Sequence, residues 1–303
     1  MQAVKIFRDG QYLDESTNHV QGNNIVQVIK NEHIEIDIYH APSGSIGGFA
    51  PKVTDSDLEI YYLISGSMTL YQPGGIESNL LPGDFMTLSE SDLYYPVSFN
   101  EDTSLMMIVT RPQFEITKST FSKLTKILND LQLQDGDTLD HCQRVCKLSM
   151  AIAIETHYDF TKLRSLFFAS KFHDVGKAQI PLDILIKPGK LTDEQYAIMK
   201  SHVVFSSDMV EPYFGKEIAE IILEHHEHLD GSGYPLGITS KDIHPASKII
   251  AVADGFDAMV TTRPYHKGIS NQEAIDELLR CDGQYDQEVV QGLITYLKKH
   301  GQL

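Results

Sequence analysis

Two short segments of this chain each place two metal-ligating side chains next to one another. The first contains the adjacent pair His173 and Asp174, and the second, further along the chain, contains the pair His225 and His226. Imidazole and carboxylate groups lose hydration on burial and are rarely buried without a partner. A cluster of metal ions can be one partner for all of them, because both kinds of group ligate transition metals. The two pairs therefore indicate a metal-dependent site.

The spacing of apolar residues predicts that these pairs lie on the buried faces of helices. Leu163, Leu166 and Phe167 repeat with helical spacing, and His173 and Asp174 continue the same face. Four further predicted helices show the same arrangement: Ile218, Ile221 and Ile222 precede His225 and His226, Ile250 and Ala253 share a face with Asp254 and Asp257, Ile198 is in line with His202, Phe205 and Met209, and Asp137 is in line with His141, Val145 and Leu148. A single buried histidine is usually a hydrogen-bonded core residue, but five such coincidences favour a shared ligand site.

The chemistry of the candidate ligands limits which metals they fit. The set mixes imidazole nitrogen with carboxylate oxygen and comprises Asp137, His141, His173, Asp174, His202, His225, His226 and Asp254. Such a set fits Fe, Mn, Zn or Ni, and differs in ligand type from a thiolate site or an all-oxygen Mg or Ca cage. These ligands are too many for one ion, and Asp174 can bridge two. The sequence thus predicts a cluster of two or three divalent ions, of the kind that clamps both oxygens in phosphoester hydrolysis.

Composition narrows the class of protein. The chain has 303 residues and a formal charge of −17, from 25 basic and 42 acidic residues. This charge disfavours binding to nucleic acid polymers and to anionic membranes, although metal ions can reverse the sign locally for a small anionic substrate. No apolar run approaches the roughly 18 residues of a membrane span. The three cysteines form no CxxC pair and are typical of free thiols, so we expect a cytoplasmic protein.

Two kinds of periodicity divide the chain. Residues 1–113 alternate with period two between short Gly and Pro turns, as in 34–39 and 82–84, which is typical of a β sandwich or barrel. Residues 114–134 form an amphipathic connecting helix with Leu124 and Leu128 on its stripe, which either packs on its own domain or pairs with a second subunit. Residues 135–303 are expected to be helical, and a capping box at 192–195 is expected to start the helix that carries His202.

The helical half resembles the HD-GYP family, a branch of the HD phosphohydrolases that degrades bacterial cyclic di-GMP. The resemblance covers about Asp137 to Leu293 and rests on His173-Asp174-Val175-Gly176-Lys177, on the HHExxDGSGYP segment from His225 to Pro235, on Ala253-Asp254-Gly255-Phe256-Asp257-Ala258 and on Arg263-Pro264-Tyr265. It implies that His141, His173, Asp174, His202, His225, His226 and Asp254 are metal ligands. Asp137 occupies the position where some members have a Glu that holds a third ion, which leaves two or three ions open.

The resemblance also suggests residues that contact the substrate. Lys177 matches a lysine beside the scissile phosphate, where it would stabilise developing charge or protonate the leaving oxygen. Arg263 matches an arginine that grips phosphate, whereas His266, followed by Lys267, stands where many members have a second cation. Tyr234 either contacts a guanine or plugs its loop onto the domain. The GYP segment is also linked to protein–protein contacts in the family.

The N-terminal half resembles a cupin. Glu59 precedes Gly66 by seven positions, and a Pro-Gly-Asp turn follows at 82–84. Cupins that bind metal have histidines before that Glu and after the second turn, but the segments 48–58 and 85–100 contain none. We therefore expect a cupin-like jelly-roll barrel without a metal site, which acts as a sensor, a dimerisation module or a structural domain.

Together these observations predict a two-domain signalling enzyme. An all-β cupin-like domain would regulate an all-α HD-type domain that contains Fe or Mn and hydrolyses cyclic di-GMP to linear pGpG, GMP or both. Two alternatives remain at this point: hydrolysis of another cyclic dinucleotide such as cyclic GMP-AMP, and a catalytically silent cyclic di-GMP receptor. Homodimerisation through the connecting helix or the barrel, and a protein partner at the GYP loop, belong to the same prediction.

Overall fold

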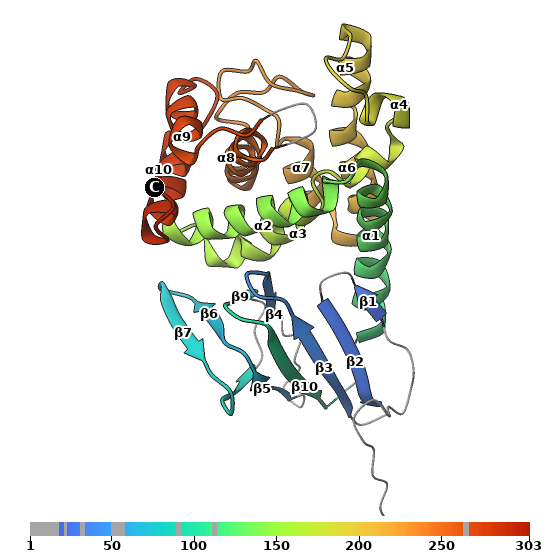
Figure 1. Ribbon diagram of the computed structural model, residues 1–303, viewed down its shortest axis with the longest axis vertical. Helices are drawn as coiled ribbons and strands as arrows, with labels where there is room; N and C mark the ends of the chain where they lie inside the picture. Colours follow the sequence, from blue (N-terminus) through green and yellow to red (C-terminus); the bar gives the residue numbers. More distant parts are fainter. Residues whose placement is uncertain are drawn as a thin grey trace, which may run out of the picture. The chain divides into compact units, whose positions relative to one another are not determined.

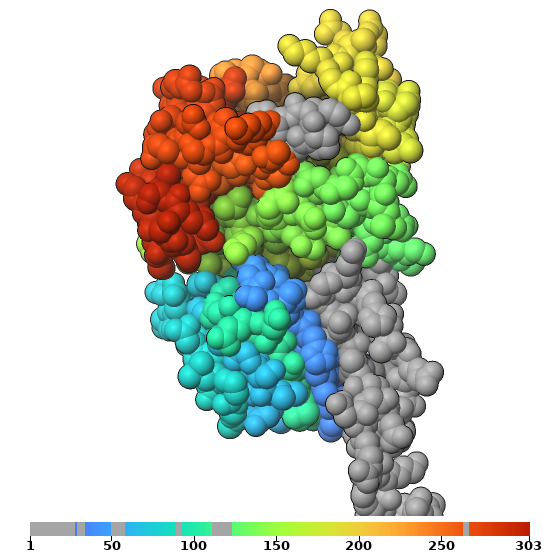
Figure 2. Space-filling model, in the orientation of Figure 1, coloured from blue at the N-terminus to red at the C-terminus, as the bar shows by residue number. Residues whose placement is uncertain are grey.

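The computed structural model describes residues 18–20, 23–30, 34–49, 58–88, 93–110, 114–262 and 267–303 (Figure 1). Its contacts divide the chain into two compact units, Met1–Ser122 and Lys123–Leu303. The first is built from strands and the second from helices, and Figure 2 shows the surface of each in space-filling form. Each unit is described by itself below.

The described strands of the first unit form two antiparallel sheets. One has the strand order β1-β2-β3-β10-β5-β8, and the other has the order β4-β9-β6-β7. The strands are β1 (Asn18–Val20), β2 (Asn23–Lys30), β3 (Glu35–Ala41), β4 (Ile46–Phe49), β5 (Glu59–Ser65), β6 (Met68–Gln72), β7 (Ile76–Leu80), β8 (Phe85–Leu88), β9 (Tyr95–Phe99) and β10 (Thr103–Val109).

Alternation along these strands builds the core of the unit. On β5, Tyr61 and Leu63 are buried, whereas the intervening Tyr62 is 37% exposed. Because successive side chains of a strand point to opposite faces, the period-two pattern of the sequence directs every second residue inward. Leu105 on β10 and Phe99 on β9 belong to the same buried cluster. The prediction of an all-β jelly-roll-like half is confirmed in this form.

The structure corrects one part of that prediction: the described strands form two separate sheets and not a closed barrel. The edge strands β7 and β8 are joined by the turn at 81–84, but no hydrogen-bonded ladder joins the two sheets among the described strands. Period-two alternation determines which face of a strand is buried and leaves open which edges pair. A cavity of about 440 Å³ lies between residues of β6, β7, β8 and β9, including Gln72, Ser78, Met86 and Tyr95. Its described lining contains no histidine or cysteine.

The second unit consists of helices, of which α1 begins in the first unit. They are α1 (Phe114–Asp135), α2 (Thr138–Glu155), α3 (Leu163–Phe172), α4 (Leu182–Leu185), α5 (Asp193–Lys200), α6 (His202–Phe214), α7 (Lys216–Leu223), α8 (Pro245–Val260), α9 (Asn271–Arg280) and α10 (Gln287–Lys299), with the 3₁₀ helices η1 (Phe160–Lys162) and η2 (Val175–Gln179). No described helix combines the length and apolarity needed to cross a bilayer.

Helix α2 is central to this unit. It packs on α3, α8 and α10, while α6 packs on α7 and on η2. Buried apolar side chains such as Val145, Met150 and Leu166 line these contacts. On α1, Leu124 and Leu128 are each only 1% exposed. The chain itself therefore buries the described part of the stripe on this helix.

The helix that carries His202 starts later than the sequence analysis expected. The capping box is confirmed, because the Thr192 side chain accepts from the Gln195 amide and the Gln195 side chain from that of Thr192. However, the capped helix α5 ends at Lys200, and His202 begins α6. Ile198 is 41% exposed, so the expected apolar face that it shares with His202 is wrong. Because the helix is interrupted at Ser201, helical spacing does not place Ile198 and His202 on one face.

Candidate metal centre

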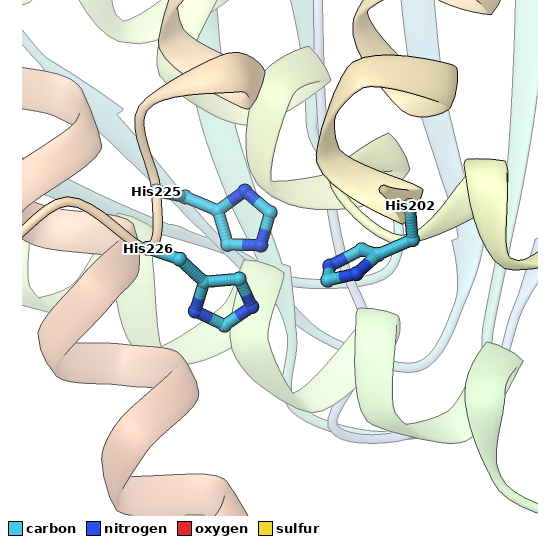
Figure 3. A group of neighbouring side chains, drawn as sticks. All are labelled: His202, His225 and His226. Atoms are coloured by element: carbon cyan, nitrogen blue, oxygen red, sulfur yellow. The ribbon is translucent and has the colours of Figure 1, made fainter. Parts of the chain in front are cut away.

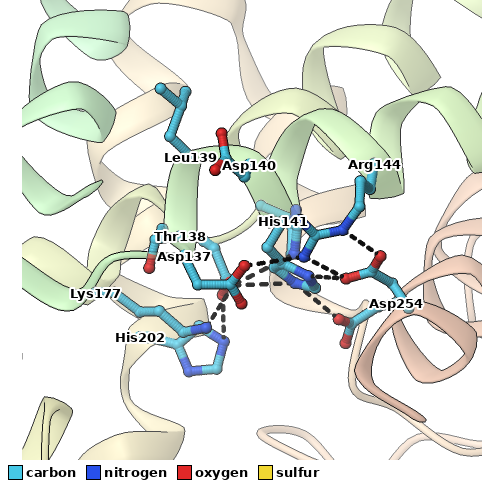
Figure 4. Close-up of polar contacts among 12 residues, drawn as sticks. Asp137, Thr138, Leu139, Asp140, His141, Arg144, Lys177, His202 and Asp254 are labelled. Atoms are coloured by element: carbon cyan, nitrogen blue, oxygen red, sulfur yellow. Dashed lines mark hydrogen bonds and ion pairs between the residues drawn. The ribbon is translucent and has the colours of Figure 1, made fainter. Parts of the chain in front are cut away.

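The structure brings the candidate ligands of five helical segments to one place (Figures 3 and 4). One group of ligand atoms belongs to His202, His225 and His226, and a second belongs to His141, His173 and Asp174; within each, the atoms lie within 4.8 Å of one another. In Figure 3 the rings of His225 and His226 lie side by side and face the ring of His202. His141 and Asp254 lie within α2 and α8, whereas the other ligands lie at helix ends.

Three of the histidines are oriented by the same device. Nδ1 lies 2.8 Å from the Ser170 carbonyl oxygen in His173, 2.8 Å from that of Met199 in His202, and 2.6 Å from that of Ile222 in His225. Each carbonyl belongs to the last turn of the preceding helix, where regular helical donors run out. Because a carbonyl only accepts, Nδ1 must carry the proton in each ring. Nε2 is then left with a lone pair directed into the site.

These lone pairs are the observation that tests whether metal ions fit. The Nε2 atoms of His173, His202 and His225 are buried and have no hydrogen-bond partner among the described residues. An orphaned buried polar atom is costly, and three in one place are exceptional. Deprotonated imidazole nitrogen is the form that binds a metal. The residues present therefore fit divalent metal ions with nitrogen and oxygen ligands.

The Asp174 carboxylate lies between the two groups. Its Oδ2 is 3.5 Å from Nε2 of both His141 and His173, and its Oδ1 is 3.2 Å from Nε2 of His202. The two oxygens thus face different sets of histidines. The carboxylate thus contacts candidate ligands of both groups.

Asp254 makes a second connection between the groups. Its Oδ1 lies 3.0 Å from Nε2 of His141, and its Oδ2 lies 3.8 Å from Nδ1 of His226. It is carried by α8, which packs on α2, so a helix–helix contact sets this separation.

Burial and charge determine the protonation of these groups. Burial lowers the pKa of His202 and of His225 to about 4, which leaves both rings neutral. Burial alone would raise the pKa of the Asp174 carboxyl, but the Lys177 ammonium and nearby histidines hold it well below its usual value. For His141, burial lowers the pKa, and hydrogen bonds to Asp254 and Asp257 outweigh this and raise it to about 9. The carboxylates thus favour a cation at His141.

Asp257 orients His141. The sequence analysis placed Asp257 on the same helix face as Asp254 but gave it no role. Nδ1 of His141 lies 2.7 Å from Oδ2 of Asp257, which lies in the last turn of α8. The Arg144 guanidinium binds both oxygens of Asp257. It also binds Asp137 Oδ1 (Figure 4). The signal for Arg144 was its spacing, because Asp137, His141 and Arg144 stand at i, i+4 and i+7.

The HD domain family matches residues 119–289, which is more than half of the chain. The chain belongs to this family. A cyclic di-GMP phosphodiesterase of Thermotoga maritima is 39% identical over 182 residues, covering 58% of this chain and 50% of that protein. A 3′3′-cGAMP-specific phosphodiesterase of Vibrio cholerae is 34% identical over 170 residues, covering 55% and 39%. The chain spans about half the length of the first curated relatives it matches.

The solved structures that are similar to this chain also include a cupin domain. The cupin domain of a transcriptional regulator from Enterobacter cloacae matches with a TM-score of 0.26 and 12% identity, covering 31% of this chain and all of that one.

The close packing of the HD segment explains its glycine. A Cβ on Gly176 would lie 2.3 Å from the His202 carbonyl oxygen and from the Ser206 amide nitrogen. The Gly176 amide also donates to the Ser206 hydroxyl at 2.8 Å. Only glycine lets η2 approach the first turn of α6 this closely. This contact sets Asp174 and Lys177 against His202.

The loop after His226 folds back on a buried glutamate. Oε1 of Glu227 accepts from the amides of Leu236 and Gly237 at 2.6 and 3.1 Å. A Cβ on Gly233 would lie 2.4 Å from the His228 nitrogen, so this turn also requires glycine. The sequence analysis gave Glu227 no role, because burial of a single Glu within a loop has no periodic signal.

The expected substrate residues divide into three cases. Lys177 lies at the centre, with Nζ 2.5 Å from Asp174 Oδ2. The Tyr234 ring stacks on His226 with centroids 4.9 Å apart, and the Lys200 ammonium lies 4.8 Å from its centroid. Lys267 is exposed, and Arg263 and His266 lie outside the described residues.

Proposed function

We propose that this protein is a metal-dependent phosphodiesterase that hydrolyses cyclic di-GMP to linear pGpG, GMP or both. The observation that carries the proposal is the set of three buried Nε2 atoms near the Asp174 carboxylate that have no hydrogen-bond partner among the described residues. Membership of the HD domain family and relatives named as cyclic di-GMP phosphodiesterases support the same reaction.

The ligands proposed for the metal ions are His141, His173, Asp174, His202, His225, His226 and Asp254, with Asp137 at the margin. Their nitrogen and oxygen donors suit Fe or Mn first, and Zn or Ni also. When bound, two such ions polarise the phosphodiester and lower the pKa of the attacking water. The Asp174 carboxylate orients both halves of the site through its two oxygens.

Lys177 is the proposed catalytic cation. Its ammonium contacts Asp174 Oδ2 and its side chain is 20% exposed, so it reaches the ligand cluster from the solvent side. There it stabilises the negative charge that develops on phosphorus oxygens, or donates a proton to the leaving oxygen. Tyr234, Arg263 and Lys267 are the proposed contacts to the rest of the substrate.

A second substrate is supported by the relatives named 3′3′-cGAMP-specific phosphodiesterases. The metal chemistry would be the same, because both substrates have the same type of phosphodiester. Discrimination between them depends on the base, so the two substrates are compared directly in the test.

The N-terminal unit is proposed to regulate this activity. Its cavity of about 440 Å³, lined by apolar side chains together with Gln72, Ser78, Asp84 and Thr87, supports the binding of a small molecule. The three free cysteines support a reducing compartment such as the cytoplasm. A homodimer and a protein partner at the GYP loop complete the proposal, and light scattering of the full chain tests the first.

The test uses protein purified without oxygen and loaded separately with Fe or Mn. Cyclic di-GMP and cyclic GMP-AMP are incubated with it, and the products are separated by chromatography. We expect linear products, and no turnover by the double variant His173→Ala, Asp174→Ala that circular dichroism shows to be folded. Wild-type protein that binds cyclic di-GMP with either metal but never cleaves it would be a receptor and not an enzyme.

A further inference from the structure

Arg144 binds two carboxylates at the edge of the candidate metal centre, those of Asp137 and Asp257. It stands on the same face of α2 as Asp137 and His141, because the three are spaced by four and three residues. The Arg144 side chain is 37% exposed, whereas the Asp257 side chain that it binds is 2% exposed. It thus covers the buried carboxylate from the solvent side.

The contact between Arg144 and Asp257 is bidentate. Nε lies 2.6 Å from Oδ1, and Nη2 lies 3.0 Å from Oδ2. A planar guanidinium matches a carboxylate in this fork geometry, which fixes both position and orientation. Since Asp257 Oδ2 also accepts from His141, Arg144 acts on that histidine through Asp257.

The same guanidinium holds Asp137. Nη2 lies 3.0 Å from Asp137 Oδ1, so one nitrogen joins two carboxylates. Asp137 belongs to neither group of clustered ligand atoms among the described residues. A divalent ion bound to Asp137 would lie close to a fixed positive charge, and like charges repel strongly in a partly buried site.

We propose that the Arg144 guanidinium supplies the positive charge of a third ion at Asp137 and Asp257, so that the centre holds two ions. The inference rests on the proposed function only in requiring a metal centre at these residues. Four carboxylates (Asp137, Asp174, Asp254 and Asp257) face two cations (Lys177 and Arg144), which leaves a negative site. Two divalent ions reverse its sign and favour a substrate with two phosphates.

The test counts ions per chain by mass spectrometric elemental analysis after loading with Mn and desalting. Wild-type protein is expected to hold two. Arg144→Met keeps the aliphatic stem but removes the guanidinium charge from Asp137 and Asp257, and it is expected to hold three. Arg144→Lys retains the charge and is expected to stay at two. Combining Arg144→Met with Asp137→Asn is expected to return the count to two, because the added ion loses its carboxylate.

Two results overturn the inference: three ions in the wild type, or two ions in folded Arg144→Met. If Arg144→Met does not fold, Asp137→Asn alone decides. It should keep two ions, and loss of one would make Asp137 a ligand and refute the inference. The count is made without substrate. A wild-type protein with two ions that cleaves no cyclic dinucleotide would therefore refute the proposed function while this inference stands.

Discussion

The hydrogen bond between His141 Nδ1 and Asp257 Oδ2, 2.7 Å long, differs from those of the other oriented histidines in its acceptor. His173, His202 and His225 bind neutral backbone carbonyls, whereas His141 binds a carboxylate. A charged acceptor makes a stronger bond and raises the basicity of the opposite ring nitrogen. His141 Nε2, which lies near both Asp174 and Asp254, is thus the most electron-rich imidazole donor of the four.

Asp257→Asn should weaken metal binding without removing a ligand. The amide is neutral and can present either a donor or an acceptor to Nδ1, so it no longer specifies the tautomer of His141. Loss of such an orienting carboxylate typically costs about 10- to 100-fold in metal affinity. Titration of Mn against a chelating dye measures the change.

The control for this variant is Asp140→Asn on α2. Asp140 is exposed, accepts from Gln132, and belongs to neither group of clustered ligand atoms. Its substitution should leave the affinity for Mn within error. Equal affinities of wild-type and Asp257→Asn protein would show that His141 needs no carboxylate to orient it.

Gly176→Ala should destabilise the helical unit and the centre together. The new Cβ meets backbone atoms of α6 that cannot move aside, so η2 must separate from α6. Overpacking of this kind costs roughly 1–3 kcal/mol. Chemical denaturation measures the free energy of unfolding, and elemental analysis measures retained metal.

Ser206→Ala is the matched comparison at the same contact. It removes the acceptor of the Gly176 amide without adding an atom, at a cost of about 1–3 kcal/mol for the unsatisfied buried donor. The metal content should then remain that of the wild type. If Gly176→Ala keeps both the stability and the metal content of the wild type, close packing of η2 on α6 is not the reason for the glycine.

The sequence predicts the positions of the candidate ligands best where they lie inside regular helices. His141 and Asp254 are separated from buried neighbours by whole turns, so helical periodicity places them correctly. His202 is reached by a different route. The chain breaks at Ser201, and the ring is directed by a carbonyl of the preceding helix rather than by the face that Ile198 was expected to share.

Orienting residues were harder to predict than ligands for a physical reason. Asp257 lies on the same face as Asp254, and periodicity alone cannot separate a carboxylate that binds a metal from one that binds the back of a histidine. Arg144 is partly exposed, as most arginines are, and only its contacts with Asp137 and Asp257 distinguish it. Pairing across helices is tertiary information that the spacing within one helix does not contain.

Removal of metal should lower the thermal stability of the protein. Binding to the folded state alone stabilises it by about 2.7 kcal/mol when free ion is at 100 times the Kd. We expect a chelator to lower the midpoint of thermal unfolding and Mn to restore it. The variant His173→Ala, Asp174→Ala should respond to neither addition. A wild-type midpoint that is indifferent to chelator and to Mn would contradict a metal centre at these residues.

Lys177→Met should lower the rate of hydrolysis while leaving the metal in place. Its ammonium contacts Asp174 but repels a cation, so its loss should not weaken metal binding. Loss of a group that stabilises charge or transfers a proton typically costs about 100-fold or more in kcat. Single-turnover hydrolysis of cyclic di-GMP and elemental analysis of the same sample measure the two effects.

Lys162→Met is the control, because Lys162 is 46% exposed and pairs with Glu217 in a surface ion pair of small energy. If Lys177→Met loses its metal along with its activity, then Lys177 serves to hold Asp174 in place rather than to act on the substrate.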